Sequence, residues 1–167
     1  MKKKDCVTLD FGANSTDMCI LANGSLVFSQ SIPIGSDSLT QAIVNKFSFD
    51  YNRAEEFKRA YGLIPNAVEG KIYGALLPIV ESIMIEIRRG VEFYKNKTMS
   101  PAPIEYLLNG DGALLPGLTE YVSKSLEVNS QVANPWLNIS IDNRFKNIIT
   151  KAGGSYSVAV GLALKDE

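Results

Sequence analysis

Residues 5–34 read DCVTLDFGANSTDMCILANGSLVFSQSIPI, and this stretch decides the fold class. Three strand-like runs, 6–10, 17–22 and 25–34, are separated by a longer turn and by the pair Asn23-Gly24. Asn-Gly between two apolar runs is typical of a type I′ hairpin, because both central residues of that turn need a positive φ. The chain is therefore predicted to begin with three antiparallel strands.

Helical periodicity replaces this pattern after residue 35. Apolar residues recur every four positions in 39–47, and Asp50 suits the N-cap of a second helix that Gly62 ends. A longer apolar stripe predicts a packing helix from 68 to 96, with a kink at Pro78. These three helices would follow the strands without interruption.

The last third is predicted to read strand, helix, strand, helix. The expected elements are a strand over 104–108, a helix over 116–126 opened by Pro116, an extended piece over 131–133, and a helix over 156–164 capped by Ser155. Residues 134–151 are expected to form an ordered loop, with Trp136 as a core anchor. The whole pattern indicates an α/β fold.

Composition narrows the function classes. The 167 residues are 46% hydrophobic and 21% charged with a formal net charge of −1, which predicts a folded protein without a general attraction to nucleic acid. Histidine is absent, which excludes Ser-His-Asp triads and His-ligated zinc. Cys6 and Cys19 lie in apolar runs and are expected to be buried free thiols. No apolar run approaches the ~20 residues that span a bilayer, so no membrane insertion is expected.

The turn after the first strand is the first candidate site. Asp10 stands at a strand end, and Gly12, Asn14, Ser15 and Thr16 follow. Such a turn can hold a phosphate chain through free amides and hydroxyls while the carboxylate reaches a hydrated Mg²⁺. The alternative is an ordinary β-turn, which uses the same residue types.

A second candidate is the glycine-rich stretch 109–118, NGDGALLPGL, between a predicted strand and a predicted helix. Its glycines would let a ligand approach the backbone, although neither a Walker A loop nor the Rossmann spacing is present. A third is the helix face that carries Glu55, Lys58 and Arg59. Taken alone, the stretch could be a structural turn and the helix face a solvated one with internal ion pairs.

The order of these three segments resembles the second half of the actin, sugar-kinase and heat-shock chaperone superfamily, which has a ribonuclease H-like fold. The closer resemblance is to the PilM family of type IV pilus assembly proteins, and more distantly to the FtsA family of cell-division proteins. It covers nearly the whole chain. The stretches that carry it are 9–17, 24–26, 31–37, 54–62 (AEEFKRAYG), 87–94, 108–118, 134–136 and 156–164.

The resemblance implies an actin-like ATPase half that begins with a three-stranded antiparallel sheet. Residues 1–36 and 97–167 would form a sheet-containing nucleotide-binding subdomain, and 37–96 a smaller helical lobe with a returning helix. Its ligands would be ATP and Mg²⁺. Asp10 would hold the Mg²⁺ water shell, Gly12, Asn14, Ser15 and Thr16 the outer phosphates, and Glu55, Lys58, Arg59, Gly110, Asp111 and Gly112 the adenosine.

Two departures bear on that implied site. Asn109 and Asp111 stand where the family usually has glycine, and Asp111 would repel phosphates if it pointed inward. The resemblance also places the other phosphate loop and much of the catalytic apparatus in the first half of such proteins. We therefore expect no catalytic residue in this chain, weak nucleotide binding and no useful turnover.

The resemblance further implies a cytoplasmic scaffold, peripheral to the inner membrane, that links ATP state to pilus-assembly or related secretion or competence proteins of that membrane. The groove for the membrane partner would lie chiefly in the other half. Self-association is an additional expectation, since surface that the other half covers would be exposed. The alternatives are an FtsA-like division protein fragment, a small-molecule kinase of the same superfamily, and a structural module that no longer binds ATP.

Overall fold

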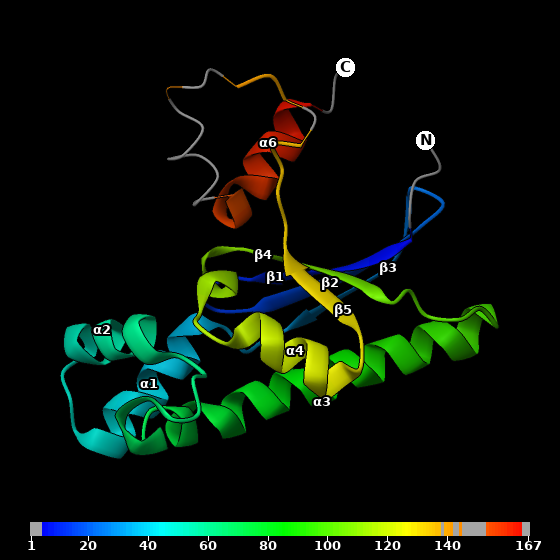
Figure 1. Ribbon diagram of the computed structural model, residues 1–167. Coiled ribbons are helices and arrows are strands. Elements are labelled where there is room, and N and C mark those ends of the chain that lie inside the picture. The colour runs from blue at the N-terminus through cyan, green and yellow to red at the C-terminus, as the bar shows by residue number, and fades with distance from the viewer. Residues whose placement is uncertain (1–4, 138, 142–143, 145–152, 165–167) are drawn as a thin grey trace.

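The computed structural model describes residues 5–137, 139–141, 144 and 153–164. Its centre is a five-stranded sheet with the order β3-β2-β1-β4-β5 (Figure 1). The first three strands are antiparallel, as predicted, whereas β4 pairs with β1 and β5 pairs with β4 in parallel. The strands are β1 Cys6–Phe11, β2 Thr16–Ala22, β3 Ser25–Ile32, β4 Glu105–Asn109 and β5 Asn129–Val132.

Helices cover both sides of this sheet. In Figure 1, α3 runs along one face, α4 lies beside it, and α1, α2 and the start of α3 gather at one end. The last helix, α6, stands on the opposite side of the sheet. The α-helices are α1 Ser36–Phe47, α2 Tyr51–Tyr61, α3 Tyr73–Thr98, α4 Leu118–Leu126 and α6 Ser157–Ala163; the 3₁₀ turns are η1 Ala67–Gly70, η2 Asp111–Leu114 and η3 Gly153–Tyr156.

Local signals in the sequence place several boundaries correctly. Asn23 and Gly24 have φ values of 52° and 78°, which confirms the predicted turn between β2 and β3. The carboxylate of Asp50 accepts a hydrogen bond from the backbone N–H of Arg53 at 3.0 Å, which confirms it as the N-cap of α2. Gly62, with φ at 45°, ends that helix.

The prediction that the long helix begins at Val68 is wrong. Val68 and Glu69 have positive φ values of 50° and 55° inside η1, and α3 begins only at Tyr73. The Val68 side chain is exposed and so does not belong to the apolar stripe. The apolar spacing continues across this break, and such periodicity does not indicate where single residues adopt a left-handed conformation.

Pro78 lies within α3, and its missing backbone N–H leaves the carbonyl of Gly74 without its usual helical donor. The ammonium of Lys46, from α1, donates to that carbonyl at 2.9 Å. A side chain from the neighbouring helix thus replaces the bond that proline removes.

Three further expectations near the end of the chain are corrected. Pro116 precedes α4, whose N-cap is Gly117 with φ at 78°, and the Pro116 carbonyl instead accepts from the backbone N–H of Leu63 at 2.7 Å. Ser155 lies inside η3, and the N-cap of α6 is Tyr156. Trp136 is half-buried beside the ring of Tyr156, at 6.1 Å between centroids, and lies outside the buried core. Most of the predicted loop 134–151 lies outside the described residues.

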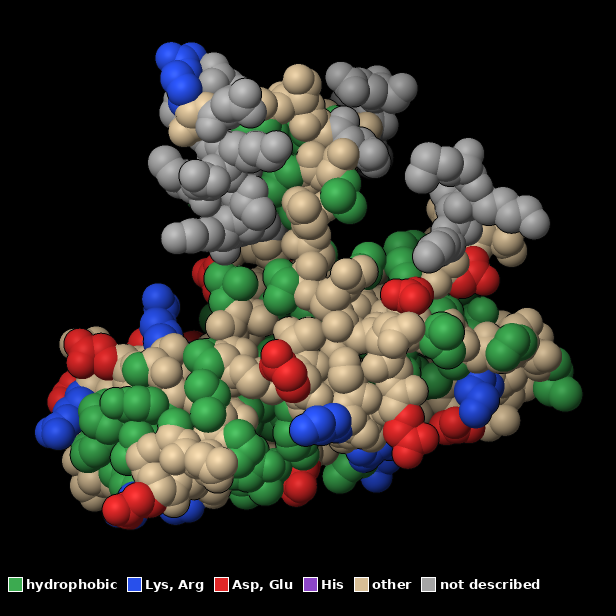
Figure 2. All heavy atoms as spheres, viewed as in Figure 1, with side chains coloured by type: hydrophobic (Ala, Val, Ile, Leu, Met, Phe, Trp, Pro, Cys, Tyr) green, Lys and Arg blue, Asp and Glu red, His purple; other side chains and the backbone are tan. Residues whose placement is uncertain are grey.

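The core lies between the sheet and α3. Its fully buried side chains come from strands β1 to β4 and helices α1 to α4, and include Leu9, Met18, Ile43, Leu76, Ile87 and Leu108. Both cysteines are free thiols, as predicted, and Cys6 is buried, whereas Cys19 is only half-buried. No helix in the described part of the chain combines the length and apolarity needed to span a membrane. Figure 2 shows acidic and basic side chains interspersed over the viewed face.

Candidate functional site

A pocket of about 360 Å³ lies between α2 and η2. It brings together two segments that the sequence singled out separately, the charged face of α2 and the glycine-rich turn after β4. The volume is at the lower end of the range for small-molecule sites. Its lining residues are Ser36, Leu39, Glu55, Lys58, Arg59, Asp111, Gly112, Leu114 and Leu115.

Glu55 is the centre of the charged wall. Its two carboxylate oxygens each meet one cation, Lys58 and Arg59, at 2.7 Å. The hydroxyl of Thr40 donates a third contact at 2.6 Å. Burial alone would raise the pKa of Glu55, but the hydrogen bonds from Lys58, Thr40 and Arg59 outweigh burial and lower that pKa to about 2. Glu55 is therefore an anion at neutral pH and accepts, rather than donates, hydrogen bonds.

Lys58 differs from its neighbours in being almost completely buried, with a relative exposure of 3%. Besides Glu55, its ammonium donates to the hydroxyl of Thr40 at 2.8 Å and to the hydroxyl and carbonyl of Ser36 at 2.6 Å and 3.2 Å. These contacts tie α2 to α1. All N–H donors of this ammonium are used inside the protein. Lys58 therefore forms part of the pocket wall but has no free donor to offer a ligand.

The Glu55 carboxylate should make stability depend on acid pH. Its folded pKa of about 2 lies below the ordinary 4.5, so its contribution is present above pH 4.5 and is lost as the pH falls toward 2. We expect Glu55→Gln to lower the free energy of unfolding at pH 7 by about 2 kcal/mol, after allowance for water at the site. Urea unfolding from pH 7 to pH 3 measures this.

The exposed neighbour Glu56 provides the control for that measurement. Glu56→Gln should leave the urea midpoint nearly unchanged at every pH, whereas the curves of Glu55→Gln and the parent should converge as the pH falls. Parallel curves for Glu55→Gln and the parent over the whole range would contradict the assigned low pKa.

The glycine-rich turn packs directly under the end of β1. Gly110 has φ at 80°, and a Cβ there would overlap the carboxylate of Asp10 and lie 2.6 Å from the carbonyl oxygen of Phe11. A Cβ at Gly112 would lie 2.8 Å from the same carbonyl. Glycine is required because the turn must approach β1 this closely. The backbone N–H of Gly110 donates to the carbonyl of Gly154 at 3.1 Å, which joins the turn to η3.

Asp10 stands at the carboxyl end of β1, flanked by Asp17 on β2 and Asn109 on β4. Burial, and next the negative charges of Asp17 and Asp111, raise the pKa of Asp10. A cation at this strand end would relieve that repulsion. Within the described residues, no three Asp, Glu, Cys or His side chains are placed to hold a metal ion together. A Mg²⁺ ion at this strand end would therefore need phosphate or water oxygens as further ligands.

The turn after β1 is held by its own backbone and by α1. The N–H of Gly12 donates to the carbonyl of Ser15 at 2.9 Å, and the N–H of Ser36 donates to the Gly12 carbonyl at the same distance. Thr16 is fully buried, and its hydroxyl donates to the carbonyl of Ile34 at 2.8 Å. Among the residues the structure describes, the N–H groups of Asn14 and Ser15 meet no protein acceptor. They remain available to a ligand, whereas the Thr16 hydroxyl is used within the fold.

The eleven predicted residues thus fall into three groups. Glu55, Lys58, Arg59, Asp111 and Gly112 line one pocket, and Gly110 connects that pocket to Asp10. The turn residues Gly12, Asn14, Ser15 and Thr16 do not line it, although Ser36 is shared between the turn and the pocket.

Sequence reasoning missed three contributors to this arrangement. Ser36 and Thr40 anchor Lys58, and Gly154 supports Gly110. The spacing of Ser36 and Thr40, one helical turn apart on α1, places them on one face, but nothing local indicates that a lysine from α2 would meet them.

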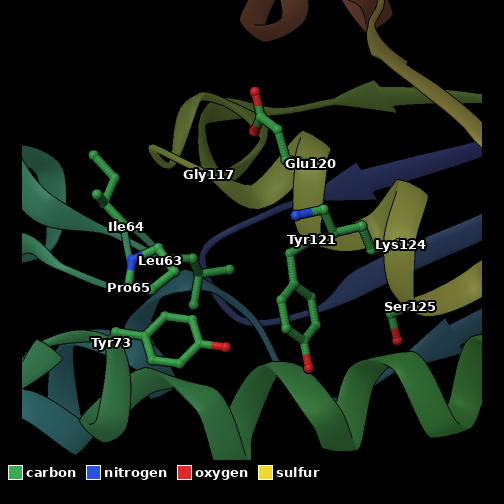
Figure 3. Close-up of a pocket in the computed structure, with 9 residues that line it drawn as sticks. All are labelled: Leu63, Ile64, Pro65, Tyr73, Gly117, Glu120, Tyr121, Lys124 and Ser125. Carbon is green, nitrogen blue, oxygen red and sulfur yellow. The ribbon is translucent and has the colours of Figure 1, made fainter.

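A second groove of about 520 Å³ lies between the segment after α2 and α4 (Figure 3). Leu63, Ile64 and Pro65 form one wall, and the rings of Tyr73 and Tyr121 extend into the space. Its remaining lining residues are Gly117, Glu120, Lys124 and Ser125 from the α4 side. None of the predicted site residues lies in this groove, and its walls are mainly apolar. The pocket between α2 and η2 is therefore the candidate functional site.

The chain is similar to several known proteins. A family model described as type IV pilus assembly protein PilM matches residues 1–167. The solved PilM-PilN type IV pilus biogenesis complex is similar with a TM-score of 0.84 and 30% identity, over 97% of this chain and 46% of that chain. The cell division protein FtsA of Bacillus subtilis (strain 168) is 25% identical over 145 residues, which cover 76% of this chain and 33% of FtsA. The chain spans less than half the length of both relatives.

More distant structures share the fold. MreB 5 of Spiroplasma citri bound to AMPPNP is 16% identical, with a TM-score of 0.69, over 96% of this chain and 52% of that chain. At this level of identity the similarity shows the fold alone. The predicted α/β, actin-like ATPase fold is confirmed.

Proposed function

Because this chain belongs to the family of the type IV pilus assembly protein PilM, we propose that it supplies the second half of a Mg-ATP site in a pilus-assembly scaffold. The observation that carries the proposal is the single pocket in which Glu55 and Arg59 of α2 meet Asp111 and Gly112 of η2. Two segments far apart in the sequence converge there on a space suited to a nucleoside.

In this proposal, different residues bind the ribose, the base, the phosphates and the Mg²⁺ ion. Glu55 accepts hydrogen bonds from ribose hydroxyls, and Leu39, Leu114 and Leu115 supply apolar surface for the base. Arg59, whose side chain is 76% exposed and paired with Glu55, contacts the ligand from the pocket wall. The unpartnered amides of Asn14 and Ser15 hold outer phosphates, and Asp10 holds the hydrated Mg²⁺. The bound metal would supply charge neutralisation to the phosphates.

The same proposal covers partners and location. The similar solved structure is a complex of PilM with PilN. We infer that this chain acts in the cytoplasm, at the inner membrane, through partners of the pilus-assembly machinery. The other half of the cleft completes the site, so the chain alone binds nucleotide weakly and does not turn it over.

Calorimetric titration with Mg-ATP tests the proposal. The 167-residue chain should give saturable binding, and Asp10→Ala should weaken it at least about 10-fold, because a charge-assisted contact to the hydrated metal is lost. Glu120→Ala, which removes an acidic side chain from the wall of the second groove, should leave the affinity for Mg-ATP unchanged. The absence of saturable heat at millimolar nucleotide, or equal affinity for the parent and Asp10→Ala, would contradict the proposed site.

One second candidate has its own support. Asp111 brings a negative charge into the pocket wall, and the ammonium of Lys58 is occupied by Ser36, Thr40 and Glu55. Both features suit a structural module of the same family that no longer binds nucleotide. An unresponsive titration with an intact thermal unfolding transition would favour this candidate.

A further inference from the structure

Strand β3 forms one outer edge of the sheet, and no other described strand pairs with its second side. Alternate backbone groups along such an edge point away from the sheet and are open to another strand. Natural proteins usually protect an edge with charged residues, proline or a very short strand. β3 runs for eight residues, SLVFSQSI, and contains neither a charged residue nor a proline.

The regular part of this strand is complementary to itself. After a register shift between Ile20 and Leu21 of β2, residues 28–32 pair without interruption and read FSQSI. Two copies that pair in antiparallel fashion about Gln30 would place Phe28 opposite the partner's Ile32. Each Ser29 would then face the partner's Ser31. Ser29 and Ser31 are exposed, so hydroxyls meet hydroxyls across the contact, whereas Phe28 is half-buried and Ile32 is buried within its own copy. Like residues thus face like residues, which is the condition for a two-fold symmetric contact.

Both ends of the segment limit the pairing to this register. The register shift lies at one end, and Pro33, which lacks an N–H, follows the other. Because Phe28 of one copy pairs with Ile32 of the other, the register shift in one copy lies opposite Pro33 of its partner. A slip by one residue would place serine against apolar side chains and is disfavoured.

Apolar surface continues beside the edge. The ring of Phe28 lies 5.9 Å from that of Phe93 on α3, and Phe93 remains 55% exposed. Leu26, near the start of β3, is 60% exposed. Paired residues direct their side chains to the same face of a sheet, so both copies of α3 would lie on one face of the joined sheet. Phe28 and Phe93 of each copy would then border the contact.

We propose that two copies of this chain join antiparallel through residues 28–32 of β3, centred on Gln30, to form one continuous sheet. The proposal is independent of nucleotide binding, because β3 lies at the sheet edge and contributes no residue to the pocket.

Sedimentation equilibrium of three forms of the chain tests this register. The parent should show a concentration-dependent dimer. Ser29→Lys/Ser31→Lys places like charges opposite each other at two symmetric positions and should weaken the dimer at least about 10-fold. Ser29→Glu/Ser31→Lys places opposite charges at the same positions and should restore parent-like association. Far-UV circular dichroism and thermal unfolding establish that all three forms are folded.

The three-way comparison separates this contact from other surfaces. Restoration by the Glu/Lys form supports the proposed pairing, since only this register brings positions 29 and 31 together. A parent that stays monomeric at high micromolar concentration overturns the proposal. A Lys/Lys form that dimerises as well as the parent, or a Glu/Lys form that does not recover, also overturns it and assigns any association to another surface.

Discussion

Replacement of the buried cation by an apolar side chain of similar length, Lys58→Met, should lower the free energy of unfolding by about 3 kcal/mol. The ammonium contacts Glu55, Thr40 and Ser36, and its removal takes one donor from each of them. Glu55 then keeps only Thr40 and the exposed Arg59 as donors. Breaking a buried pair costs more than breaking an exposed one, because water replaces the lost contacts less well in a buried site. Urea unfolding at pH 7, followed by circular dichroism, measures the change.

Arg59 offers a closely matched control. It pairs with the same carboxylate at the same 2.7 Å, one residue further along α2, but its side chain is 76% exposed. Arg59→Met should therefore cost less than about 1 kcal/mol. Equal losses for the two variants would show that burial does not distinguish the two ion pairs and would contradict the structural role assigned to Lys58.

A methyl group on the glycine-rich turn should be similarly damaging. Gly110→Ala is expected to destabilise the fold by about 3 kcal/mol, since alanine at φ 80° is strained and its Cβ would overlap the carboxylate of Asp10. The displacement of Asp10 should also weaken Mg-ATP binding. Thermal unfolding and calorimetric titration measure the two effects.

Gly161 is the control for this substitution. It lies within α6, and a Cβ there would meet nothing within 4 Å. Gly161→Ala should be neutral or stabilising by up to about 1 kcal/mol, because alanine favours the helix. If Gly110→Ala were equally harmless, the turn would have room to move away from β1, and the close contact with Asp10 would not be needed.

Much of the fold was predictable because the relevant signals are local. The Asn23-Gly24 pair, the Asp50 cap and the Gly62 stop each act within a few residues. The errors arose where a single backbone conformation or a distant partner decided the outcome. Val68 continues an apolar period yet adopts a left-handed conformation. Pro116 lies before α4, and its carbonyl accepts a hydrogen bond from the backbone N–H of Leu63.

The candidate site shows the same division. Sequence pattern and family resemblance together indicated Glu55, Arg59, Asp111 and Gly112 as residues of one site, and the tertiary structure shows that they share one pocket. The pattern could not separate Lys58 from Arg59, which stand side by side on α2. Only the packing of α2 against α1 buries the first and exposes the second.

The order of strands and helices, most element boundaries and the residue types available for chemistry follow from the amino-acid sequence, because propensity, capping and turn preference depend on near neighbours. Which of those residues can still contact a ligand depends on the tertiary structure. Hydrogen bonds from Lys58, Thr40 and Arg59 lower the pKa of Glu55 against the effect of burial, contacts with α1 occupy the ammonium of Lys58, and burial raises the pKa of Asp10. These are properties of surroundings that the chain assembles only on folding.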